Sequence, residues 1–134
     1  MENLNNSEDP EKSMQENKHY TDLAYLEKLS NGDKTFILEM ISVFLAQTPM
    51  TIESMWTYFN NKDWNSLRGI AHKSKPSLAF MGIKDLESVA ISIEEYADKE
   101  SSLELLPDLI KKMEFVCKEA IKELELIKIK LTNN

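Results

Sequence analysis

The stretch 106-LPDLIKKMEFVCKEAIKELELIKIKL-131 decides the fold of this 134-residue chain. Its apolar residues follow one another at intervals that alternate between four and three. They are Leu106, Ile110, Met113, Cys117, Ala120, Leu124, Ile127 and Leu131. This spacing predicts one long helix whose apolar seam faces the core of a left-handed helical bundle.

Earlier segments also have apolar residues at helical spacing. They cover residues 22–30, 37–59, 64–81 and 86–97. Pro49 predicts a bend near Thr48 in the second segment, and Asp63 is the expected N-cap of the third. With the last helix, these segments predict an all-α fold. It is an antiparallel four-helix bundle over residues 20–132, with a short N-terminal lead-in helix.

The composition limits the class of protein. A net charge of −7 and a pI near 4.9 make nucleic acid a poor partner. Residues 1–19 are polar, which predicts a disordered tail without the apolar core of a signal peptide. No apolar run is expected to approach the ~20 residues of a membrane span. The single cysteine, Cys117, fits a core position in a reducing compartment, so we expect a cytoplasmic protein without membrane contact.

The stretch 68-RGIAHKSKPSLAFMG-82 contains the candidate functional residue, His72. Residues 65–84 include four cations and no carboxylate, although the chain is acidic overall. On a helix, His72 lies about 100° from the buried line through Ala71, so its side chain faces sideways or outward. A single imidazole is therefore expected on a face of small residues and cations.

Several functions could use such a histidine. A metal site would need more ligands than His72 and the remote His19 supply, so we expect none. A hydrolytic triad would need a carboxylate, which this segment lacks, and Ser74 lies on the core stripe. A neutral imidazole is also a nucleophile, and nearby cations would stabilise an incoming phosphoryl group. Spacing alone leaves a phosphoryl acceptor and a solvated surface histidine both open.

The segment 71-AHKSKPSLAFMGI-83 resembles the signature of histidine-containing phosphotransfer (HPt) domains, a family of four-helix bundles. The family pattern is Ala-His-x-apolar-Lys-Gly-Ser, followed by a glycine ten residues after the histidine. The matching residues are Ala71, His72, Lys75, Ser77, Gly82 and Ile83. The resemblance extends from about Asp22 to Leu131.

This resemblance implies a phosphocarrier in a two-component phosphorelay. His72 would accept a phosphoryl group from a receiver domain of a hybrid histidine kinase and pass it to the receiver of a response regulator. Lys75 would screen the phosphoryl charge. The docking face would comprise Arg68, Gly69, Lys73, Pro76 and Ala79, and the motif would be shaped by Ala71, Ser77 and Gly82.

The same resemblance implies no ATP site and no cofactor, with any Mg²⁺ on the receiver, so the chain would not be an enzyme in its own right. The sequence has no GxxxxGK[ST] loop. Two other interpretations stay open: an adaptor that binds receivers without transferring phosphate, and the phosphoacceptor domain of a larger histidine kinase. The polar tail after Met1 favours a free-standing protein, and the family suggests a monomer.

Two positions depart from the family pattern. Pro76 stands where glycine is usual, and Ser74 stands where a large apolar residue is usual. Proline removes the helical hydrogen bond to the His72 carbonyl. We expect the Ser74 hydroxyl to bond back to the Ile70 carbonyl, and both changes predict a local bend around His72.

Overall fold

The structure is a computed structural model that describes residues 18–133. The predicted tail, 1–19, lies outside this range except for Lys18 and His19, so its disorder stays a prediction. Five α-helices and two short 3-10 helices make up the described chain. They are α2 (Ala24–Ser30), α3 (Lys34–Asn60), α4 (Trp64–Phe80), η1 (Lys84–Leu86), α5 (Glu87–Lys99), η2 (Leu103–Leu105) and α6 (Leu106–Thr132).

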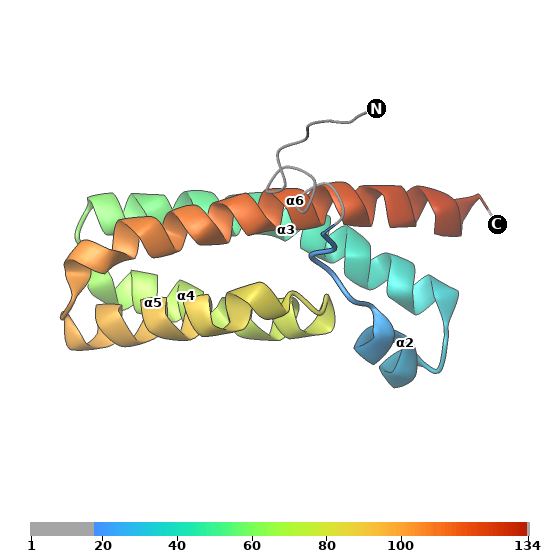
Figure 1. Cartoon of the computed structure of the whole chain (residues 1–134), viewed down its shortest axis with the longest axis horizontal. Helices are drawn as coiled ribbons and strands as arrows, with labels where there is room; N and C mark the ends of the chain where they lie inside the picture. Colours follow the sequence, from blue (N-terminus) through green and yellow to red (C-terminus); the bar gives the residue numbers. More distant parts are fainter. Residues whose placement is uncertain (1–17, 134) are drawn as a thin grey trace, which may run out of the picture.

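The four long helices form the predicted antiparallel bundle. In Figure 1, α3 and α6 lie side by side, and α4 and α5 form a hairpin below them. The main packing contacts join α3 with α4 and α6, and α5 with α4 and α6, so that α4 and α6 lie on a diagonal. The lead-in helix α2 packs beside the start of α3.

The core contains the apolar seams predicted for each helix. On α6, the buried members are Leu106, Ile110, Met113, Cys117, Ala120 and Leu124. The last two seam residues, Ile127 and Leu131, are only half-buried. The reason is visible in Figure 1, where the end of α6 extends past the α4–α5 hairpin.

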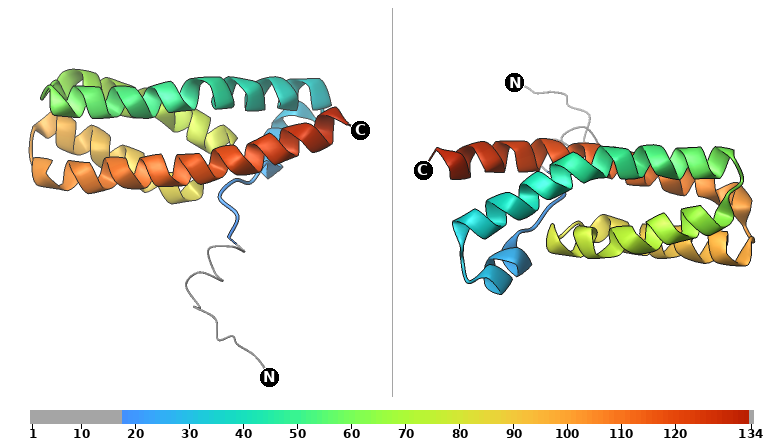
Figure 2. Two further views of the ribbon diagram at one scale, coloured as in Figure 1. Left: turned by 90° about the horizontal axis from the view of Figure 1, so that it is seen from above. Right: turned by 180° about the vertical axis from the view of Figure 1, so that it is seen from behind.

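Helix α3 changes direction partway along its length, as Figures 1 and 2 both show. Pro49 lies inside this helix. It has no N–H to donate to the Leu45 carbonyl, which is a known cause of helix bending. The bend expected near Thr48 is therefore confirmed.

By length and composition, α3 could cross a membrane, which corrects the expectation that no apolar run approaches that length. It contains an 18-residue window of mean hydropathy 1.4. The buried side chains of α3 nevertheless point into the bundle core. They are Ile37, Ile41, Phe44, Thr48, Ile52 and Met55. These six side chains account for part of its apolar character, and 28% of the apolar window is buried.

Two aspartates cap the N-termini of α3 and α4. Asp33 accepts hydrogen bonds from the backbone N–H groups of Thr35 and Phe36 at the start of α3. Asp63 accepts one from the Ser66 N–H, at 3.2 Å, at the start of α4. The cap predicted at Asp63 is confirmed, and it satisfies an otherwise unpaired donor.

The segment before α2 ties the end of α4 to α6. The Asp22 N–H donates to the Met81 carbonyl at 3.0 Å. The Glu123 carboxylate on α6 accepts from the backbone N–H groups of Tyr20 and Thr21, at 2.7 and 3.0 Å. It also accepts from the Thr21 hydroxyl at 2.8 Å. These bonds hold the segment across one end of the bundle.

Gly82 is the residue that allows the segment around Asp22 to pass across the end of α4. Its φ of +64° is in the left-handed region, and a Cβ atom there would overlap the Asp22 backbone carbonyl. The other glycines have open space around them: Gly32, at φ +76°, and Gly69, in α4, have no atom within 4 Å of a built Cβ.

We predict that Gly82→Ala lowers the free energy of unfolding by about 3 kcal/mol, from backbone strain plus displacement of Asp22. Gly32→Ala should cost only the strain, about 1 kcal/mol. Gly69→Ala should stabilise α4 by up to about 1 kcal/mol. Urea unfolding of the three variants measures the order of their free energies of unfolding. Equal losses of this free energy for Gly82→Ala and Gly32→Ala would contradict the prediction.

Candidate functional site

His72 lies on the outer face of α4. Its side chain is 63 % exposed, whereas its neighbour Ala71 is fully buried. Ala71 packs into the core and thereby sets the rotation of the helix. The structure thus places His72 on the sideways-to-outward face that the helical wheel predicts.

A carboxylate from the neighbouring helix meets the imidazole. Glu94, on α5, places Oε2 3.0 Å from His72 Nδ1 and Oε1 2.6 Å from Lys75 Nζ. Its side chain is 24 % exposed, so it is partly shielded from water. The expected face of small residues and cations on α4 is therefore joined by a carboxylate that the sequence analysis did not predict. The missing acid lies across the helix interface rather than in the same segment.

The register of the α4–α5 hairpin brings Glu94 to this position. Residues 72 and 94 lie at equal distances in sequence on either side of Ile83, in the turn between the two helices. The same symmetry relates Arg68 to Asp98, whose side chains are 3.7 Å apart. Because both helices rise by the same amount per residue, such pairs lie opposite one another. Reflection about Ile83, the residue that follows the predicted helix stop at Gly82, was therefore a usable sequence signal for Glu94.

The electrostatics of the cluster favour one tautomer of His72. The ion pair with Lys75 holds the pKa of Glu94 below its usual value, and the His72 hydrogen bond adds to this effect while partial burial opposes it. An ionised carboxylate can only accept hydrogen bonds. The contact with Nδ1 therefore requires the proton on that nitrogen. In the neutral ring, the lone pair is then on Nε2, the nitrogen that Glu94 does not contact.

Pro76 and Ser74, the two departures from the family pattern, leave α4 intact as a helix. It runs from Trp64 to Phe80 through Pro76, so the bend expected around His72 does not break it. Pro76 still provides no N–H for the His72 carbonyl. The Ser74 hydroxyl donates to the Ala71 carbonyl at 2.7 Å, which corrects the predicted bond to Ile70.

The predicted docking residues share the outer part of α4 with His72. Lys73, Pro76 and Ala79 are exposed, and Arg68 and Gly69 are half-buried. The residues expected to shape the motif lie elsewhere: Ala71 in the core, Ser77 half-buried and Gly82 in the turn.

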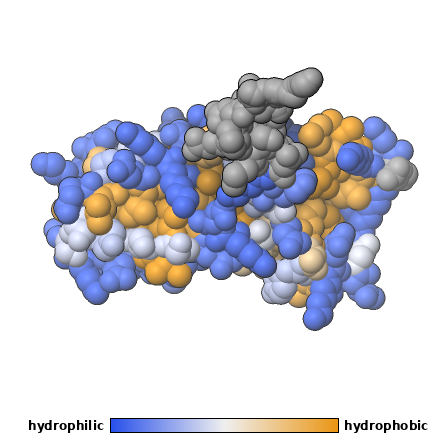
Figure 3. All heavy atoms as spheres, viewed as in Figure 1, coloured by the Kyte–Doolittle hydropathy of each residue, from blue (hydrophilic) through white to orange (hydrophobic). Residues whose placement is uncertain are grey.

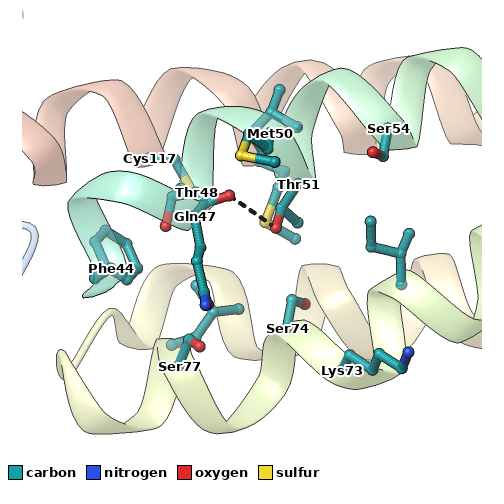
Figure 4. A pocket seen from close by; sticks show the side chains of 14 residues that line it. Phe44, Gln47, Thr48, Met50, Thr51, Ser54, Lys73, Ser74, Ser77 and Cys117 are labelled. Atoms are coloured by element: carbon teal, nitrogen blue, oxygen red, sulfur yellow. Dashed lines mark hydrogen bonds between the residues drawn. The ribbon is translucent and has the colours of Figure 1, made fainter. Parts of the chain in front are cut away.

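A cavity of about 420 Å³ opens between α3 and α4, on the side of α4 away from Glu94. Figure 4 shows Gln47 reaching from α3 towards Ser77 of α4, with Lys73 at the rim. Cys117 of α6 lines its inner wall. Burial raises the pKa of the Cys117 thiol to about 12, so this cysteine is a core residue rather than a nucleophile.

Comparison with known proteins gives one family and one similar structure. A family model described as "Hpt domain" matches residues 39–127. The crystal structure of histidine-containing phosphotransfer protein B (HptB) from Pseudomonas aeruginosa PAO1 is similar, with a TM-score of 0.73. Sequence identity is 21%, and the match covers 83% of this chain and 96% of that chain, which establishes the shared fold. No match was found among curated proteins.

We predict that Glu94→Gln removes a pH-dependent part of the stability. Because the folded pKa of Glu94 is lowered, its contribution is present above the unfolded value near 4.5 and is lost as pH falls through the folded pKa. The free energy of unfolding of wild type should exceed that of the variant by about 0.5–1 kcal/mol at pH 7. This difference should shrink as the pH falls below 4.5 and vanish once the pH is below the folded pKa of Glu94. Urea unfolding at several pH values measures it.

Glu95→Gln is the matched control, because Glu95 pairs only with Lys99 on its own helix, and both side chains are exposed. A larger loss for Glu95→Gln than for Glu94→Gln at pH 7 would contradict the prediction.

Proposed function

Because the chain belongs to the Hpt domain family, we propose that it carries phosphoryl groups on His72 between receiver domains of a two-component phosphorelay. Family membership supports a histidine phosphotransfer role. The observation that carries the assignment to His72 is its exposed imidazole, whose Nδ1 is held by Glu94. His19, the other histidine, also lies in the described range, but it precedes the bundle helices.

The proposed transfer forms a bond between His72 Nε2 and phosphorus. The Nε2 lone pair attacks the aspartyl phosphate of a receiver, and the P–O bond to the aspartate breaks with the carboxylate as leaving group. The proton on Nδ1 stays hydrogen-bonded to Glu94, whose negative charge stabilises the positive charge that develops on the ring. The reverse reaction delivers the phosphoryl group to the aspartate of a second receiver.

Lys75 is the candidate for screening the phosphoryl charge. It lies one turn from His72 on the same face of α4, and its ammonium group is anchored by Glu94 at 2.6 Å. Glu94 therefore positions the nucleophile and the cation together. In phosphoryl transfer, catalysis comes mainly from positioning the reacting groups and stabilising the charge on the phosphoryl group. We therefore expect this chain to contribute in these two ways.

The receiver would dock on the outer part of α4. Exposed Pro76 and Ala79 leave room for an approaching active site, and Lys73 supplies a cation without an ion-pair partner among residues 18–133. Mg²⁺ and the remaining catalytic groups would belong to the receiver. On this proposal the chain is a cytoplasmic carrier without an ATP site, rather than an enzyme in its own right.

We predict that His72→Gln abolishes labelling by a phosphorylated receiver domain, whereas His19→Gln is labelled like wild type. The label on wild type should be acid-labile, as expected of a phosphohistidine. Incubation with radiolabelled receiver, followed by gel analysis after acid and base treatment, measures it. Binding of receivers without any label on wild type would replace the carrier with the adaptor interpretation, and label on His72→Gln would place the acceptor elsewhere.

We also predict different effects for two neighbouring lysines. Lys75→Gln should lower the limiting rate of transfer by about tenfold, because the phosphoryl group loses a nearby cation. Lys73→Gln should mainly raise the receiver concentration that gives half the limiting rate, in a salt-dependent way. Rapid-quench transfer kinetics at varied receiver concentration separate these outcomes, and identical effects of the two variants would contradict the assignment.

A further inference from the structure

Helix α6 has a second line of residues at alternating spacing of four and three, on the face opposite its core seam. We call this line the outer seam: Phe115, Glu119, Lys122, Leu126 and Ile129. Phe115, Leu126 and Ile129 are 50%, 62% and 55% exposed, and they are the three of the nine large exposed apolar side chains in residues 18–133 that lie on this line. A line with this spacing is the pattern of a coiled-coil interface. Within residues 18–133 no helix packs on it, although the Tyr20 ring meets the Phe115 ring edge-on, with the ring centres 6.4 Å apart.

The outer seam points away from the transfer site. Helix α6 packs against α3 and α5, and it lies diagonally across the bundle from α4. Figure 3 shows hydrophobic surface towards the C-terminal end of α6, where that helix extends past the α4–α5 hairpin. The outer face of α6 and His72 therefore lie on two helices that are not neighbours in the bundle.

Four of the five outer-seam residues are complementary to one another when two copies run antiparallel, and Ile129 then lies opposite Lys112 of the second copy. A twofold axis between Ala120 and Ile121 places Phe115 opposite Leu126 of the second copy. The same axis places Glu119 opposite Lys122 of the second copy. Each pairing occurs twice by symmetry, giving two apolar layers around a central cluster of alternating charge.

The charges beside the seam fit the same arrangement. Lys118 and Glu125 lie on one flank of the outer seam, and the twofold axis brings Lys118 near Glu125 of the second copy. Glu125 has no ion-pair partner among residues 18–133, and Lys118 contacts Glu114 at only 3.8 Å. Glu119 and Lys122 already pair within the helix at 3.0 Å. This surface is thus locally neutral in a chain of net charge −7, so a second copy can approach here without net repulsion.

We propose that α6 pairs antiparallel with α6 of a second copy to form a twofold dimer. The two His72 side chains are then on outer faces of the dimer, and each stays accessible to a receiver. The dimer departs from the monomer that the family resemblance suggests, and it does not depend on the phosphocarrier role of His72.

Sedimentation velocity of the full chain over micromolar to millimolar concentrations tests the dimer. We expect wild type to move from monomer to dimer, and Leu126→Lys to stay monomeric. Ile91→Lys is the matched control, because Ile91 on α5 is 51% exposed and lies off the outer seam. It should associate like wild type. A monomeric wild type throughout, or a dimer that survives Leu126→Lys, overturns the proposal.

Charge exchange tests the register. Glu119→Lys and Lys122→Glu should each raise the dissociation constant at least about tenfold, because each places like charges opposite one another across the twofold axis. An equimolar mixture of the two variants should recover association, since only a mixed pair matches every charge. Circular dichroism verifies that both variants stay helical. Failure of the mixture to recover, with both variants folded, overturns this arrangement.

Discussion

The close approach of Asp22 to Gly82 is the constraint on which the site depends. Gly82 ends α4 with a left-handed backbone and has no side chain to block the crossing segment. The turn that follows sets where α5 begins relative to α4, and therefore which residues of the two helices face each other. Glu94 meets His72, and Asp98 meets Arg68, because that turn has this length and shape.

The contact between Glu94 and His72 links the exposed imidazole of α4 to a carboxylate of α5. One carboxylate holds the proton of Nδ1 and anchors the Lys75 ammonium, so a single side chain orients both groups. These contacts join α4 to α5, two helices that pack against each other through the apolar core. The orientation of the ring is therefore set by the bundle rather than by the loop geometry that often positions functional residues.

The two outer faces of the bundle carry different chemistry. Around His72, small residues and cations of α4 meet the Glu94 carboxylate of α5, and this is the face to which the proposed function assigns receiver docking. On α6, large apolar side chains alternate with a matched acid and base, which suits pairing with an identical helix. Because α4 and α6 lie on a diagonal, one surface can be occupied while the other remains open.

The sequence by itself determined the long helices, the cap at Asp63 and most of the buried seams, because apolar spacing and capping residues act over a few positions along the chain. It also identified His72 and Lys75 as candidate site residues and revealed the family pattern around them. Only the tertiary structure decided that Glu94 joins this pair, that Ser74 bonds to Ala71, and which apolar residues of α6 stay exposed. These outcomes depend on the register and the bending of neighbouring helices. They are set by contacts between segments distant in sequence, which local spacing does not encode.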